Sequence, residues 1–195
     1  MQSQNRIAFK EWGAVCAALE QGTQSVIVRK GGIHEGEAGF RVEHSEFWMF
    51  PTRFHQGAEQ LQPGKSSLLN QPLSKEPESG KLNLALYSVV ETVLELKDPS
   101  LLPRLQSLQV LSAETIQQRF EYKNPGLFVL LVRVFRLEQP VEVEQESRFA
   151  GCHSWVELSQ DYTTADLKPV LNSEQFQEVQ QAFQEIVDSA QSSRL

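Results

Sequence analysis

Residues 126–137 constrain the fold most strongly, because this segment reads GLFVLLVRVFRL and its first half is almost entirely apolar. A run of this length and character predicts a β-strand that is buried on both faces. A second apolar segment, residues 84–96, predicts another long strand, although its Leu, Ala and Glu content also suits a helix. The chain is therefore expected to fold around a sheet that contains these two strands.

Shorter patterns complete the expected secondary structure. β-Branched or alternating residues predict strands at residues 24–28, 47–50, 141–143 and 154–158. Apolar residues spaced by three and four predict amphipathic helices at residues 7–20 and 173–190, and Ser112 suits the N-cap of a short helix at residues 113–120. Strands and helices do not alternate strictly, which disfavours a doubly wound parallel sheet. The pattern favours an α+β fold with a small, mostly antiparallel sheet or a partly open β-barrel, an N-terminal helix and a C-terminal helix.

The length of 195 residues fits one domain with appendages. We expect residues 1–172 to form a single α+β domain and residues 173–195 to form a C-terminal helix and tail. Within the domain, residues 57–83 are rich in Gln, Pro, Ser and Gly and contain few large apolar side chains. Three prolines break any regular element there, so the sequence predicts a long loop.

The charge balance and the hydropathy limit the classes of partner. A net charge of -7 opposes nonspecific binding of nucleic acid by the whole surface, although Arg29, Lys30, Arg41 and Arg53 can still form a local basic patch. No apolar run is long enough for a transmembrane helix, so no membrane partner is expected. The first residues lack the pattern of a secretory signal, so a cytoplasmic location is expected. The sequence does not indicate an oligomeric state.

The window of residues 24–56 is the strongest candidate for a binding site. An apolar strand runs into Arg29, Lys30 and a pair of glycines, and a second strand, residues 47–50, runs into a polar segment that ends at Gln56. Glycines permit close backbone approach, and their amides can cradle an anion. The pattern matches neither a Walker loop nor a dinucleotide fingerprint, and a simple glycine turn after a strand is the plainer interpretation. Arg29 and Lys30 are adjacent on a strand, so they are expected to point to opposite sides.

Other chemistry-bearing residues in the chain have plainer interpretations. His34, His44 and His55 lie in the same window as several glutamates, but no helical spacing of ligands defines a metal site. The aromatic strand at residues 47–50 is interpreted as part of the core, and a platform on which a base stacks is the less favoured alternative. Cys152 precedes a histidine, but adjacent strand residues point to opposite faces, so a turn is favoured over a nucleophile.

Several segments, taken in order, carry a resemblance to a known family. They are AFKEW at 8–12, RKGGIHE at 29–35, EFWMFPTRFHQ at 46–56, VLLVRVFRL at 129–137 and GCHSWVEL at 151–158. Together they resemble the bacterial domain of unknown function 1802 family, a resemblance that carries over no catalytic residue. A fainter resemblance in the first helix, glycine turn and strand is to PUA-like and ASCH-type domains. That resemblance implies a β-barrel fold and a cleft that binds RNA or a nucleotide beside the first helix and strand.

These observations support three hypotheses. The first is a module that binds a nucleotide, RNA or another phosphate-bearing ligand, and its candidate residues are Lys10, Trp12, Arg29, Lys30, His34, Glu35, Thr52, His55 and Gln56. The second is a metal-dependent hydrolase or nuclease that uses histidine and glutamate side chains of the 34–56 region. The third is a non-catalytic protein that binds a partner. No cofactor follows from the residues.

Overall fold

A computed structural model describes residues 1–30, 42–53, 55–70, 80–151 and 153–192. The strands are β1 (Gln4–Trp12), β2 (Val26–Arg29), β3 (Glu46–Thr52), β4 (Lys81–Leu96), β5 (Leu127–Glu144), β6 (Trp155–Thr163) and β7 (Lys168–Pro169). The α-helices are α1 (Gly13–Glu20), α2 (Ala113–Glu121) and α3 (Ser173–Ser192). Short 3-10 segments are η1 (Ala58–Gln60), η2 (Ser66–Asn70), η3 (Pro99–Ser107) and η4 (Ser147–Phe149).

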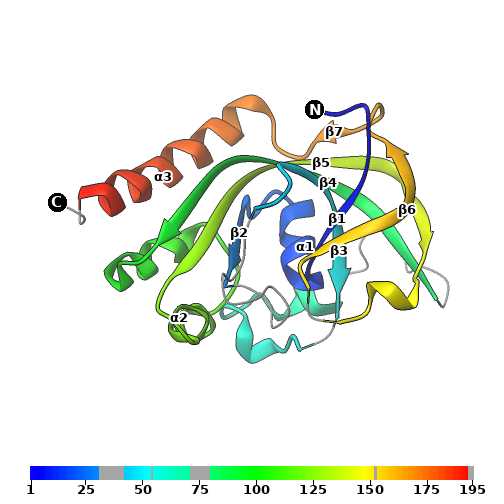
Figure 1. Ribbon diagram of the computed structural model, residues 1–195. Helices are drawn as coiled ribbons and strands as arrows, with labels where there is room; N and C mark the ends of the chain where they lie inside the picture. The colour runs from blue at the N-terminus through cyan, green and yellow to red at the C-terminus, as the bar shows by residue number, and fades with distance from the viewer. Residues whose placement is uncertain (31–41, 54, 71–79, 152, 193–195) are drawn as a thin grey trace.

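The strands form one curved, open sheet in the order β2-β5-β4-β3-β1-β6, and β7 pairs with β5 (Figure 1). Every strand pair is antiparallel except β1 with β3, which is parallel. The predicted α+β class with a mostly antiparallel sheet is therefore confirmed, and the sheet does not close into a barrel. Helix α1 lies on the concave side of the sheet, between β2 and β1 (Figure 1).

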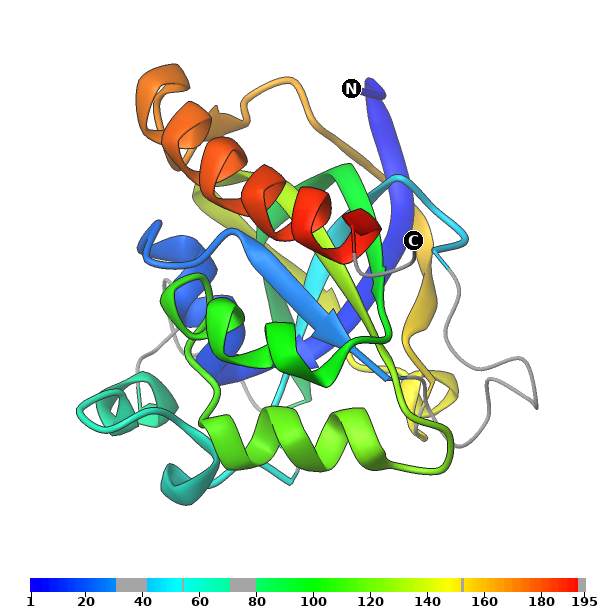
Figure 2. The same cartoon turned by 90° about the vertical axis from the view of Figure 1, so that its left-hand side faces the viewer.

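Two buried clusters occupy the two sides of the sheet. The larger one contains most of α1 and β2, the apolar residues of β5 from Leu127 to Val134 and the buried stripe of α3. It includes Leu130, and Trp12, Phe128 and Trp155 pack against it, so these four side chains share one core. The smaller cluster contains Trp48 and lies on the other face of β1 and β3. Figure 2 shows α3, η3 and α2 stacked on the side of the molecule that also carries β2.

The first predicted helix is partly wrong. Residues 7–12 belong to strand β1, and the helix begins only at Gly13. Phe9 packs into the larger cluster while Ala8 packs into the smaller one, so both faces of this strand are buried. Burial on both faces removes the polar alternation that marks a half-exposed strand, and the remaining apolar spacing imitates a helix.

The other predicted elements agree with the structure in type. The strand predicted at residues 141–143 is the end of β5, which continues past Pro140. Pro140 is tolerated because the pairing of β5 with β4 shifts register between Leu84 and Leu86, where a ladder hydrogen bond is already missing. Helix α2 begins as predicted, since the Ser112 hydroxyl accepts a hydrogen bond from the backbone N–H of Thr115. Across the described residues, every helix is too short or too polar to span a bilayer.

Candidate anion-binding site

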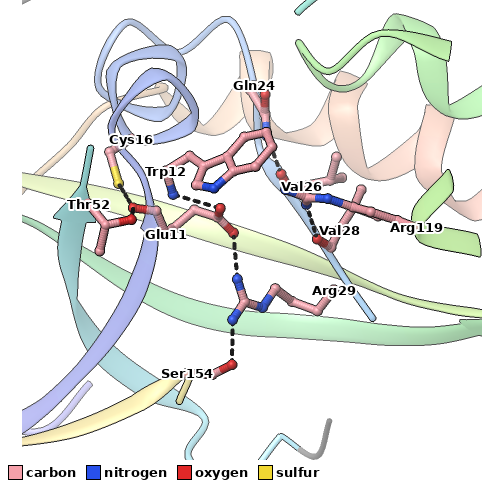
Figure 3. Close-up of polar contacts among 10 residues, drawn as sticks. All are labelled: Glu11, Trp12, Cys16, Gln24, Val26, Val28, Arg29, Thr52, Arg119 and Ser154. Carbon is pink, nitrogen blue, oxygen red and sulfur yellow. Dashed lines mark hydrogen bonds and ion pairs between the residues drawn. The ribbon is translucent and has the colours of Figure 1, made fainter. Parts of the chain in front are cut away.

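The two ends of the open sheet meet through one arginine side chain. Arg29 is the last residue of β2, and its guanidinium donates a hydrogen bond to the hydroxyl of Ser154, just before β6 (Figure 3). Its Nη1 lies 3.5 Å from Oε2 of Glu11 on β1. The guanidinium also lies 4.8 Å from the centre of the Phe9 ring. Side chains therefore bridge the seam that the backbone leaves open.

Glu11 provides a buried carboxylate at this seam. Its side chain is only 1% exposed, because it points to the same side of β1 as Phe9. One oxygen, Oε1, accepts a hydrogen bond of 2.7 Å from the backbone N–H of Trp12. The other oxygen, Oε2, accepts no hydrogen bond from the described residues and has only the long ion pair with Arg29. A buried carboxylate of this kind depends on nearby positive charge.

Arg119 of α2 reaches the same place from another part of the chain. Its guanidinium donates a 2.9 Å hydrogen bond to the carbonyl oxygen of Val28 and stacks 4.4 Å from the centre of the Trp12 ring (Figure 3). Burial, opposed by the charge of Glu11 and assisted by that of Arg29, lowers the pKa of Arg119 to about 10. Arg119 therefore remains charged at neutral pH. Within the described part of the chain it forms no ion pair with a carboxylate.

Two of the predicted site residues hold the corner between β1 and α1. The Thr52 hydroxyl donates to the backbone carbonyl oxygen of Glu11 at 3.2 Å. The side-chain oxygen of Gln56 accepts a hydrogen bond of 3.2 Å from the N–H of Ala14, in the first turn of α1. Trp12 is the N-cap residue of α1 and offers no side-chain cap, so Gln56 takes over that role. Thr52, Trp12 and Arg29 thus contact Glu11, and Gln56 holds the adjoining first turn of α1.

The two predicted lysines lie elsewhere. Lys30 follows Arg29 but points away from it, as the strand alternation predicts, and its Nζ donates to the carbonyl oxygens of Phe120, Asn124 and Gly126. Burial lowers the pKa of Lys30. Lys10 is 9% exposed, and its Nζ donates to the carbonyl oxygens of Phe149 and Gly151. Neither ammonium group belongs to the cluster around Glu11.

The histidines do not assemble a metal site in the described residues. His55 is exposed and has a left-handed backbone with φ +60°. His44 packs edge-on against Trp155, with 5.1 Å between the ring centres. His34, Glu35 and Arg41 lie outside the described residues. No group of three His, Cys, Asp or Glu side chains in the described ranges is placed to hold a metal ion.

The aromatic strand follows its plainer interpretation as core. Phe47 and Met49 belong to the larger cluster, whereas Trp48 and Phe50 belong to the smaller one, so both faces of β3 are core. Cys16 is fully buried on α1, and burial raises the pKa of its thiol well above the usual value, so it stays protonated. Cys152 lies outside the described residues.

Sequence reasoning missed three members of the cluster, Glu11, Arg119 and Ser154. The position of Glu11 can be predicted only if residues 4–12 are recognised as a strand. The alternation of a strand then places its side chain on the same face as that of Phe9. Arg119 is an ordinary polar residue of an amphipathic helix in the sequence. No local sequence pattern connects it to Trp12.

The fold and the cluster define an α+β protein whose open sheet is joined at its seam by arginine and glutamate side chains. The chain belongs to the family described as Domain of unknown function (DUF1802), whose model matches residues 8–182. No curated protein matches the sequence significantly.

Solved structures with a related arrangement come from an ASCH protein of Zymomonas mobilis. One single-substitution variant is 15% identical, with a TM-score of 0.47, and the match covers 89% of this chain and 94% of that one. A second variant is 13% identical, with a TM-score of 0.44 and coverage of 92% and 96%. The unsubstituted protein is 13% identical, with a TM-score of 0.43 and coverage of 89% and 92%.

Proposed function

We propose that this protein binds a phosphate-bearing ligand, such as a nucleotide or RNA, at the cluster of Arg29, Arg119 and Trp12. The observation that carries the proposal is Arg119, which stays charged, is half-buried and has no carboxylate partner among the described residues. A guanidinium in this state gains most from an anion that arrives from outside the chain, because desolvation has already weakened its contact with water.

The chemistry around Arg119 suits phosphate in particular. A guanidinium presents a planar fork of donors that matches two phosphate oxygens, and a second guanidinium, that of Arg29, contributes to the field. Arg29 is 18% exposed, so it is accessible at the rim of the same cluster. Trp12 provides an aromatic surface next to Arg119, and an aromatic ring beside cationic groups is the combination that nucleotide-binding sites use. The net charge of -7 does not prevent this, since salt screens distant charges beyond roughly 8 Å.

The direct test is titration of the purified protein with mononucleotides and short RNA, followed by fluorescence anisotropy or calorimetry at two salt concentrations. We expect Arg119→Gln to weaken binding by at least about tenfold, since hydrogen bonds to charged groups contribute roughly 1.5–3 kcal/mol. Arg29→Lys retains the charge but loses the fork, so it should weaken binding less. Arg6→Ala is the matched control, because Arg6 is an exposed arginine paired with Asp161 on the outer strand pair β1 and β6.

Three results decide the proposal. Binding that weakens with salt and with Arg119→Gln, but not with Arg6→Ala, supports it. The proposal is wrong if no nucleotide or RNA binds to the folded wild-type protein. It is also wrong if Arg119→Gln and Arg6→Ala weaken binding equally, because the interaction would then depend on total charge rather than on this site.

A further inference from the structure

An exposed aromatic turn follows α2 beside the proposed site. Tyr122 is the C-cap residue of α2 and is 50% exposed, and the other large apolar side chains exposed in the described ranges, Met1 and Val93, are not aromatic. The ammonium group of Lys123 lies 5.4 Å from the centre of the Tyr122 ring. An exposed aromatic ring beside a cationic side chain is the combination on which nucleic-acid bases stack.

Hydrogen bonds from Lys30 hold the turn. The ammonium group of Lys30 donates hydrogen bonds to the carbonyl oxygens of Phe120, Asn124 and Gly126. These three residues flank Tyr122 and Lys123 in the chain. Lys123 adopts a left-handed backbone with φ +58°, and Gly126 has φ +138°. Half-buried Lys30 is therefore used to fix the shape of an otherwise exposed turn. A surface that is ordered before binding loses less conformational entropy when a ligand arrives.

The turn is also connected to the arginine cluster at two points. Tyr122 follows Arg119 by three residues, and positions three apart lie on neighbouring parts of a helix surface. Lys30, which holds the turn, directly follows Arg29 in the chain. Lys123 lies beside the ring, and the carboxylate of Glu121, which precedes Tyr122 in the chain, already accepts a hydrogen bond from the Gln117 side chain.

We propose that the turn around Tyr122 and Lys123 is a second subsite, which stacks one base of a single-stranded nucleic acid. The inference rests on the proposed function, because a phosphate of the same strand would occupy the Arg29 and Arg119 cluster. It specifies the ligand class further: a strand of two or more nucleotides binds better than a mononucleotide. The strand is single because a base must be unstacked to lie on Tyr122.

The experiment compares a mononucleotide, a dinucleotide and a hexanucleotide of one sequence, as both RNA and DNA, on the full chain. Wild type should bind the hexanucleotide more tightly than the mononucleotide. Tyr122→Ala should weaken hexanucleotide binding by about 5- to 150-fold, the range that corresponds to loss of one stacked base. Tyr122→Phe keeps the ring and should bind as wild type does. Lys123→Ala should weaken hexanucleotide binding more than Lys168→Ala, which removes the same charge from β7, far from α2 (Figure 1).

The outcomes separate this inference from the proposed function. If mononucleotide and hexanucleotide bind equally well and Tyr122→Ala changes neither, the second subsite is refuted while the arginine site stands. If Tyr122→Ala weakens the mononucleotide as much as the hexanucleotide, Tyr122 belongs to the first site and the inference is wrong. If no probe binds at all, both proposals fail together. Because Tyr122 is exposed, the variants should melt at nearly the same temperature as wild type, which keeps the comparison valid.

Discussion

Glu11 and Glu46 are two carboxylates on neighbouring parallel strands, and their surroundings differ in kind. The Oε2 atom of Glu46 accepts hydrogen bonds from the backbone N–H of Gln2 at 2.7 Å and from the hydroxyl of Tyr87 at 2.9 Å. The Tyr87 oxygen in turn accepts a 3.0 Å bond from the amide of Asn5. Glu11 instead forms an ion pair with Arg29, its charge also acts on Arg119, and one of its oxygens has no hydrogen bond from the described residues.

The difference separates a structural network from a candidate site. Buried polar groups in native proteins are nearly always hydrogen-bonded, so a buried oxygen without a partner needs an explanation. Around Glu46 the network is closed by the chain itself, and it fixes the start of β1 against β3 and β4. Around Glu11 the described residues do not close the network, because Oε2 has only the long ion pair with Arg29 and Arg119 has no carboxylate partner. The predictions below test whether this contrast holds.

The largest effect is expected from Glu11→Leu. Removing the buried carboxylate leaves two guanidinium groups facing each other, so the free energy of unfolding should fall by about 3 kcal/mol or more. Urea denaturation of both proteins measures this loss. The double variant Glu11→Leu/Arg119→Leu should recover part of the stability, because it removes one of the two repelling charges. Equal stability of Glu11→Leu and wild type would show that the cluster does not depend on its carboxylate.

Trp155→Ala tests the aromatic support of the same seam. The centre of the Trp155 ring lies 4.8 Å from the centre of the Phe9 ring and 5.2 Å from that of Phe47. The guanidinium of Arg29 lies over the Phe9 ring. Truncating a packed tryptophan typically costs about 3 kcal/mol, so the variant should melt well below wild type in calorimetry. Tyr122→Ala, an exposed aromatic truncation, is the control. A Trp155→Ala variant that melts within two or so degrees of wild type would make Trp155 a surface platform instead.

Glu46→Gln should have an effect that depends on pH. Burial alone would raise the pKa of Glu46, but the hydrogen bonds from Gln2 and Tyr87 outweigh it and lower the pKa below its usual value. A pKa that is lower in the folded state stabilises the protein at every pH above the pKa of the unfolded state, which is about 4.3. This stabilisation is lost as the pH falls through the pKa of the folded state.

The variant should therefore be less stable than wild type near neutral pH, by about 1–2 kcal/mol, and the gap should narrow below pH of about 4. Melting temperatures from pH 3 to 7, recorded for both proteins, measure the gap. A gap that stays constant over this range would mean that the Glu46 charge contributes nothing specific. Glu114→Gln, on the exposed first turn of α2, is a control for loss of a surface carboxylate.

The smallest effect is expected from Ser112→Ala, which removes the N-cap of α2. Loss of such a cap costs about 1 kcal/mol, and Ser112→Gly should cost only a few tenths. Because α2 carries Arg119, the alanine variant should also weaken nucleotide binding slightly, while the Glu46 network should be unaffected. Denaturant unfolding and the titration described above measure the two effects. Unchanged stability would show that the hydroxyl of Ser112 does not cap the helix in solution.

Local patterns predicted much of the secondary structure. The apolar runs at residues 84–96 and 126–137 are β4 and β5, and the stripe that begins at Phe176 is the buried face of α3. These predictions hold because an element that buries a defined face repeats its apolar residues with the period of that element. The prediction failed at β1, because a strand buried on both faces has no polar alternation to show.

The sequence by itself determined that Arg29 and Lys30 diverge, because adjacent strand residues must point to opposite faces. It also placed Arg29, Trp12, Thr52 and Gln56 among the candidate residues. Only the tertiary structure decided that Arg119 lies beside Val28, 91 positions away, and that Ser154 lies beside Arg29, 125 positions away. Contacts of this kind depend on how far the sheet curves and on which helix covers its end. Packing of the whole chain sets both, so no local pattern of residues contains them.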